Sequence, residues 1–257
     1  MSRVRRLLAP ALLLAALIGI WELYVDLHGS TFSLILPAPH QVAEALYTDR
    51  GLLWSNFLVT AKEVLLGILL ATLIGFVLAV AIHFSPLLRR AAYPLLVASQ
   101  AVPVVTFAPV LAFWLGFGLL PKLVVIALVS FFSIVVTMTA GLAAVDPDLL
   151  KLMRTFDASR ARTFWHVELP SALPGLLTGA KIAVAVSVIG AVFAEWNGSN
   201  SGLGYVILQS LPQLLSARGV AAVVILSLFA IGLFSTLALV ERLALPWAYR
   251  SSGEPAR

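Results

Sequence analysis

The polar residues with most potential for chemistry gather between Leu150 and Gly179, in the sequence LKLMRTFDASRARTFWHVELPSALPGLLTG. Four cations, two carboxylates and one histidine lie there around the aromatic pair Phe164 and Trp165. The chain has no cysteine, and its four histidines lack metal-ligand spacing, so disulfide, thiolate and zinc chemistry are not expected. Cations interleaved with aromatic rings indicate contact with another molecule rather than catalysis.

Two short helices are expected in and just before this stretch. The sequence DPD at 146–148 is a strong helix start, because an aspartate caps free N–H groups and proline is tolerated in the first turn. This helix should end near Phe156. A break at Asp157 follows, and Ser159 is placed to cap a second helix that ends at Pro170.

The second helix has one apolar and one basic face. At about 100° per residue, Ala161, Phe164, Trp165 and Leu169 share an arc opposite the basic residues. A loop that only sets membrane topology needs the charges but not the rings. The aromatic residues therefore favour a protein partner that buries this arc, with the topology loop as the alternative.

The composition indicates an integral membrane protein. Hydrophobic residues make up 61% of the 257 residues and charged residues 11%, and the mean hydropathy is +1.01. The apolar runs are continuous rather than alternating, so an all-α membrane protein is expected. A basic surplus in such a chain reflects cytoplasmic loops, so the partner is the lipid bilayer and no nucleic acid is expected.

Six transmembrane helices are predicted, since six windows reach the roughly 20 apolar residues that a bilayer core requires. They run approximately from Leu7 to Val25, Phe57 to Ile82, Tyr93 to Leu115, Leu120 to Leu142, Leu176 to Trp196, and Val220 to Leu239.

The basic residues set the orientation. With the N-terminus inside, the inner segments hold twelve lysines and arginines near span ends and the outer segments four. Both termini and the charged stretch between helices 4 and 5 are therefore expected in the cytoplasm. The first span follows the basic start MSRVRR, a pattern that signal peptides also show. Its long apolar run without a small-residue cleavage site favours a retained helix.

Three regions follow from this topology. Residues 1–56 are expected to form the first span and an outer surface segment. Residues 57–245 should form the transmembrane core with an inner loop at 146–175, and residues 246–257 a cytoplasmic tail. In the outer segment, LPAP precedes HQVAEALYTD, which predicts a turn and a short amphipathic helix.

The third predicted span carries three prolines, which suits a helix that lines a watered pathway. Ser99, Gln100 and Thr106 lie beside these prolines and are candidate pathway contacts, with Gln100 the strongest. The alternative is a kinked helix whose polar side chains satisfy its own backbone.

Glu195 and Trp196 end the fifth predicted span and are the other pathway candidates. A carboxylate at this depth should face a partner or water, in a functional or gate-stabilising role, unless it lies exposed at the outer interface. Trp196 could stack on a flat heterocycle, or it could be an interfacial tryptophan.

The inner stretch resembles the EAA loop of permease subunits of binding-protein-dependent ABC importers. That pattern has a Glu-Ala-Ala start, a glycine, an aromatic residue and the ending Leu-Pro-x-x-x-Pro-x-x-x-x-Gly. The aromatic and the ending are matched by Phe164, Leu169, Pro170, Pro174 and Gly179. Residues 151–153, Lys-Leu-Met, replace Glu-Ala-Ala, and such divergence is common in the nitrate, taurine and sulfonate branch.

Asp157 stands in the place of the glycine. Glycine at such a break usually adopts a left-handed backbone, which aspartate also visits, so the same turn is expected. LPAP and the Glu195 region also resemble the nitrate, taurine and sulfonate branch.

The resemblance implies a type I ABC importer permease with a cytoplasmic coupling helix between helices 4 and 5. Expected partners are a cytoplasmic ABC ATPase dimer, an extracytoplasmic solute-binding protein and a second permease copy in a homodimer, all at a bacterial inner membrane. ATP and Mg would bind to the ATPase. This chain would bind no cofactor, and its sequence lacks a GxxxxGK[ST] loop. The residues carried over as the ATPase-docking set are Asp157, Ala158, Ser159, Arg160, Ala161, Phe164 and Trp165.

Trp196 after Glu195 looks most like permeases for the hydroxymethylpyrimidine-type precursor of thiamine. Sulfonate, taurine or nitrate is the alternative substrate. A membrane scaffold that recruits a cytoplasmic partner is the alternative from another class, and a stand-alone secondary transporter would usually carry two repeat halves.

Overall fold

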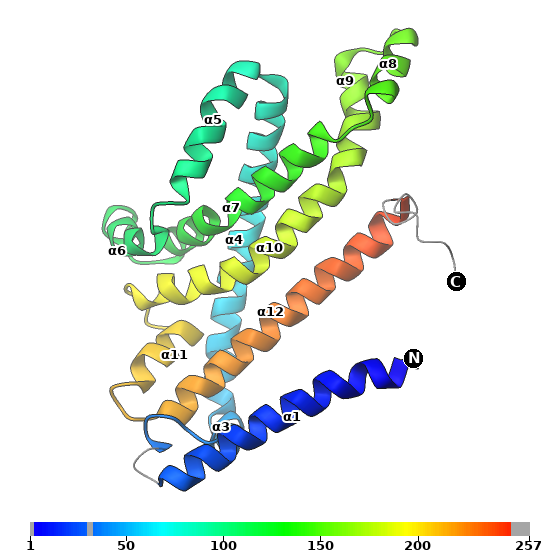
Figure 1. Cartoon of the computed structure of the whole chain (residues 1–257). Coiled ribbons are helices and arrows are strands. Elements are labelled where there is room, and N and C mark those ends of the chain that lie inside the picture. Colours follow the sequence, from blue (N-terminus) through cyan, green and yellow to red (C-terminus); the bar gives the residue numbers. More distant parts are fainter. Residues whose placement is uncertain (1–2, 30–32, 248–257) are drawn as a thin grey trace. The chain divides into compact units, whose positions relative to one another are not determined.

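The computed structural model describes residues 3–29 and 33–247 of the chain (Figure 1). These residues form helices and no strand, which confirms the all-α prediction. Among them, four helices are long and apolar enough to cross a membrane: Arg50–Phe84, Leu119–Ala143, Arg160–Trp196 and Ser216–Ala244. Of the predicted tail at 246–257, residues 248–257 lie outside the described part.

The chain forms two compact units. The first comprises Met1–Thr60 and Asn200–Ser227, and the second Ala61–Ser199 and Leu228–Arg257. Each unit is therefore built from segments that are far apart in the sequence, and α4 (Arg50–Phe84) and α12 (Ser216–Ala244) contribute turns to both.

The first unit contains α1 (Arg3–His28), α3 (Pro39–Thr48) and α11 (Leu203–Ser210) besides the first turns of α4 and α12. Helix α3 confirms the short helix predicted in the outer segment.

Polar contacts tie the first unit together. The side chain of Asn56 accepts the N–H of Gly202 at 2.7 Å, and this satisfies a free N–H at the start of α11. Gly202 has a φ of 112°, which glycine adopts without steric penalty. Arg218 at the start of α12 makes a two-pronged ion pair with Asp49, at 2.7 and 2.9 Å.

The second unit contains, in chain order, α5 (Pro86–Ser99), α6 (Val104–Leu115), α7 (Leu119–Ala143), α8 (Pro147–Thr155), α9 (Arg160–Thr163), the π-helical turn η1 (Phe164–Glu168) and α10 (Leu169–Trp196). Helices α7 and α10 lie side by side and form the centre of this unit (Figure 1).

Small residues allow α7 and α10 to approach closely. A Cβ atom at Gly175 would lie 2.5 Å from the carbonyl oxygen of Thr137, and one at Gly179 would lie 2.7 Å from the Cα of Ile134. Membrane helices gain contact area through such small residues, because no hydrophobic effect drives them together in lipid. The α7–α10 pair therefore depends on glycine at these positions.

The third predicted span is not one helix. In place of a single helix from Tyr93 to Leu115, the chain forms α5 and α6, separated by a turn at 100–103. Pro103 is the N-cap residue of α6, and its ring has no N–H to donate to the preceding turn. Pro103 therefore lies at the break, whereas Pro94 and Pro109 lie inside α5 and α6.

Candidate functional site

The inner charged stretch folds into two capped helices, as predicted. At the start of α8, Asp146 accepts the N–H of Asp148 at 2.8 Å, and at the start of α9, Ser159 accepts the N–H of Arg162 at 3.3 Å. Asp157, between the two helices, has a φ of 50°. The left-handed backbone expected at this position is thus confirmed.

Phe164 points into the second unit and is only 5% exposed. Its ring centroid lies 5.0 Å from that of Phe84, at the end of α4. The other buried residues of this cluster are Ala79, Met138, Leu142 and Ala172. The predicted apolar arc therefore does not stay on one exposed face, because the Phe164 ring is buried in the core between α4, α7 and α10.

A hydrogen-bond contact fixes the same end of α4 to η1. The Nε2 atom of His83 lies 3.0 Å from a carboxylate oxygen of Glu168, and both side chains are mostly buried. The guanidinium of Arg160 lies over the Phe84 ring at 5.0 Å. The stretch is therefore held to α4 by aromatic, hydrogen-bond and cation–π contacts together.

The second helix does not end at Pro170, contrary to the prediction. Residues 160–196 run on as one long helix through α9, η1 and α10. Just before the proline, the N–H of Leu169 donates to the carbonyl of Phe164, across a π-helical turn. A proline ring crowds the carbonyl four residues before it in an α-helix, and the wider turn relieves this crowding at His166.

The rest of the predicted docking set lies at the surface. Trp165 is 61% exposed, directly beside the buried Phe164. Ala158 is half-buried, and the exposed members are Asp157, Ser159, Arg160 and Ala161. These residues and Trp165 form the surface that we call the α9 surface.

A second polar cluster, the Lys122 cluster, lies near the other end of α10. Lys122 Nζ on α7 donates to Glu63 Oε1 on α4 at 2.6 Å and to Ser199 Oγ at 2.7 Å. Glu63 also hydrogen-bonds to Glu195 on α10, whose side chain is fully buried. A single ammonium group thus compensates two carboxyls and joins three helices.

This cluster decides between the two environments considered for Glu195. The residue is buried against a partner and not exposed at an interface. The cavity beside Lys122 has a volume of about 10 Å³, too small for a solute. The Lys122 and Glu63 side chains are 11% and 4% exposed, so the cluster is mostly buried.

The remaining pathway candidates do not join the Lys122 cluster. Ser99 and Thr106 donate to the carbonyls of Leu96 and Pro103, both at 2.7 Å, as expected for hydroxyls that satisfy their own helix. Gln100 is exposed at the end of α5. Trp196 is 37% exposed and packs edge-on against Phe193, with centroids 4.9 Å apart.

Sequence reasoning missed a further ion pair inside the spans. Lys181 on α10 lies 2.5 Å from Glu241 on α12, and both side chains are mostly buried. Lys181 interrupts an apolar run, which was a usable signal, and Glu63 near the start of the second predicted span was another. Intramembrane charges of opposite sign predict partners even where the helix order is unknown.

Helices of membrane-spanning length, a tightly packed helix pair and a charged stretch held at its end define the chain as a multi-span membrane protein. It belongs to the family described as "Binding-protein-dependent transport system inner membrane component", whose family model matches residues 67–244. The chain is thus the inner-membrane permease component of an ABC importer, and it is not itself catalytic. ATP belongs to a partner ATPase.

Curated relatives share most of their length with this chain. It is 40% identical over 205 residues to a probable ABC transporter permease protein of Haemophilus influenzae, covering 80% of this chain and 83% of the relative. It is 34% identical over 248 residues to the formylaminopyrimidine transport permease protein ThiX of Halalkalibacterium halodurans. That alignment covers 96% of this chain and 98% of ThiX. Permeases for taurine, aliphatic sulfonates and nitrate are also related.

A solved structure shares the fold. The crystal structure of an amino acid ABC transporter with histidines matches with a TM-score of 0.60 at 16% identity, over 78% of this chain and 96% of that one. This similarity agrees with the predicted resemblance to type I importer permeases.

Proposed function

We propose that two copies of this chain form a permease in which each subunit has six spans and both termini lie in the cytoplasm. This permease docks an ABC ATPase dimer through the α9 surface. In this topology, α1 and the α5–α6 pair complete the spans beyond the four helices that are long and apolar enough to cross a membrane. A solute-binding protein delivers the substrate from the opposite, extracytoplasmic side.

The contrast between Phe164 and Trp165 carries this proposal. A short helix that exposes an indole ring while its neighbour is locked into the core presents a rigid surface to a partner. Movement of the ATPase would be transmitted through Phe164 to the end of α4, because the ring contacts Phe84 there. A membrane scaffold could also expose Trp165, but it would not require this link to the spans.

Site-specific crosslinking tests the docking proposal cleanly, because the chain has no cysteine. We expect Ala161→Cys, on the α9 surface, to crosslink to the ATPase in inverted membrane vesicles. Ala91→Cys, which is exposed on α5 and lies on the same inner side beside Arg89 and Arg90, is the matched control. Equal crosslinking of the two variants would contradict docking at the α9 surface.

The substrate that we propose is a hydroxymethylpyrimidine-type precursor of thiamine. The similarity to ThiX over nearly the full length of both chains supports a pyrimidine. Taurine, a sulfonate or nitrate is the second candidate, because permeases with those names are also related.

Uptake into proteoliposomes that contain the permease, its ATPase and its binding protein distinguishes these substrates. We expect ATP-dependent uptake of labelled hydroxymethylpyrimidine that excess unlabelled taurine does not reduce. Uptake of taurine without uptake of the pyrimidine would refute the pyrimidine assignment and leave the permease function standing. Unchanged pyrimidine uptake by Trp196→Ala would remove this ring from substrate contact.

A further inference from the structure

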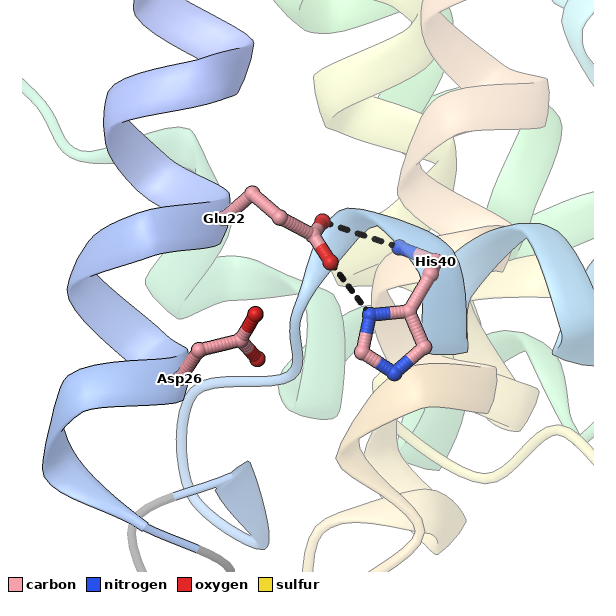
Figure 2. Close-up of side chains that lie close together, drawn as sticks. All are labelled: Glu22, Asp26 and His40. Carbon is pink, nitrogen blue, oxygen red and sulfur yellow. Dashed lines mark hydrogen bonds and ion pairs between the residues drawn. The ribbon is translucent and has the colours of Figure 1, made fainter.

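Three metal-ligating side chains converge in the first unit, from α1 and α3. Glu22 and Asp26 are four residues apart, so they lie on one face of α1. His40 lies in the first turn of α3. One ligand atom from each of the three residues lies within 4.8 Å of the other two. Figure 2 shows the two carboxylates and the imidazole ring facing the same space.

Two of these donors are already held in place. One carboxylate oxygen of Glu22 hydrogen-bonds to the His40 ring at Nδ1, and the other accepts the backbone N–H of His40 at 3.3 Å (Figure 2). This backbone contact orients the carboxylate, as outer contacts do in metal sites. An ion would displace the proton that the ring and the carboxylate share, and the two donor atoms would move apart to their coordination distances.

The contact between Glu22 and His40 does not account for Asp26. Among the described residues, Asp26 has no hydrogen-bond or ion-pair partner, and it lies in the last turn of α1, where the helix dipole disfavours an anion. It also faces a like charge on Glu22. A divalent cation would relieve this excess of negative charge.

Spacing along the sequence did not predict this set, because His40 meets the two carboxylates only through the folding of α3 beside α1. We propose that Glu22, Asp26 and His40 bind a divalent transition-metal ion, with Zn²⁺ as the representative. One imidazole and two carboxylates suit Zn²⁺, whereas Ca²⁺ and Mg²⁺ prefer an all-oxygen shell. Three protein ligands leave at least one position for water. The ion would bridge α1 and α3 within the first unit.

The site is separate from the family's shared core. All three residues precede the segment 67–244 that the family model matches. The proposal therefore does not depend on ATPase docking or on the substrate. In the proposed topology, the site faces the extracytoplasmic side.

Calorimetric titration of the purified full chain in detergent at neutral pH, with Zn²⁺ alone, tests the proposal. We expect one Zn²⁺ per chain, with affinity reduced about tenfold or more in His40→Ala, Glu22→Gln and Asp26→Asn. His28→Ala and Glu44→Gln are matched controls, a second histidine at the end of α1 and a nearby carboxylate outside the set, and should keep the affinity of the parent chain.

Co²⁺ provides a second measurement that a loss of folding cannot mimic. Substitution with Co²⁺ should produce visible ligand-field bands that Asp26→Asn alters while the thermal unfolding of the variant stays that of the parent. Absence of stoichiometric Zn²⁺ binding would overturn the proposal. So would equal weakening by Glu44→Gln and Asp26→Asn, since that result indicates diffuse attraction by acidic groups.

Discussion

The rings of Phe164 and Phe84 pack with their centroids 5.0 Å apart, while the next residue, Trp165, is 61% exposed. Two adjacent aromatic residues thus have opposite environments. One connects the inner stretch to the end of α4, and the other is available to a partner.

Replacement of Phe164 separates these two roles. Phe164→Ala should lower the free energy of unfolding by about 3–5 kcal/mol, because it removes a buried ring and leaves a cavity. Trp165→Ala should change stability by less than about 0.5 kcal/mol, as for other exposed positions. Unfolding of both variants in detergent, followed by fluorescence of the remaining tryptophans, measures the difference. Equal destabilisation would contradict the assigned environments.

The left-handed backbone at Asp157 predicts opposite results for two small substitutions. Asp157→Gly should preserve or strengthen coupling, because glycine adopts a φ of 50° without a Cβ clash. Asp157→Ala should cost about 1 kcal/mol, since alanine lacks the polar side chain that helps aspartate tolerate this conformation. ATP hydrolysis stimulated by the loaded binding protein reports coupling, and thermal unfolding reports stability. A glycine variant that is less coupled than the alanine variant would refute this account.

Removal of Lys122 leaves two buried carboxyls without their cation. Lys122→Met should destabilise the chain by about 3–5 kcal/mol, as expected when one partner of a buried ion pair is lost. Adding Glu63→Gln to this variant should recover part of the loss, because it removes one uncompensated carboxyl. A double-mutant cycle on unfolding measures the coupling, and strictly additive effects would show that the contact carries no energy.

Close packing of α7 and α10 predicts a penalty for the smallest enlargement of a helical glycine. Gly175→Ala should destabilise by about 1–3 kcal/mol, since the new methyl group meets the Thr137 carbonyl. Gly232 on α12 is the matched control, because a Cβ there has nothing within 4 Å. Gly232→Ala should be neutral or stabilise by up to about 1 kcal/mol. If both changes have the same effect, close approach is not the reason for glycine at 175.

The sequence predicted local features of the inner stretch well, because these depend on neighbouring residues. The caps at Asp146 and Ser159 and the left-handed turn at Asp157 follow from short-range hydrogen bonding and sterics. The direction of Phe164 depends on Phe84, which is 80 positions earlier in the chain, and periodicity within one helix carries no information about such a partner.

The same limit applies at the prolines and at the buried charges. Pro170 predicted a helix end, but the π-helical turn at 164–168 accommodates the proline ring within a continuous helix. The packing of that long helix stabilises the turn, and a local sequence pattern does not reveal such packing. Glu195 was identified as costly in the membrane, whereas Lys122 was counted only among the outer cations near span ends and Glu63 was not singled out. Their convergence required the packing of α4, α7 and α10.

The most direct test of the account is co-purification of the ATPase with a permease that carries Trp165→Ser. Trp54→Ser is the control, because Trp54 is also 61% exposed but lies on α4 in the first unit. We predict that Trp165→Ser inserts in the membrane at the parent level. It should lose at least about 90% of the bound ATPase, and a tenfold weaker affinity corresponds to about 1.4 kcal/mol of binding free energy. Trp54→Ser should retain it. Full retention of the ATPase by Trp165→Ser would contradict docking at the α9 surface.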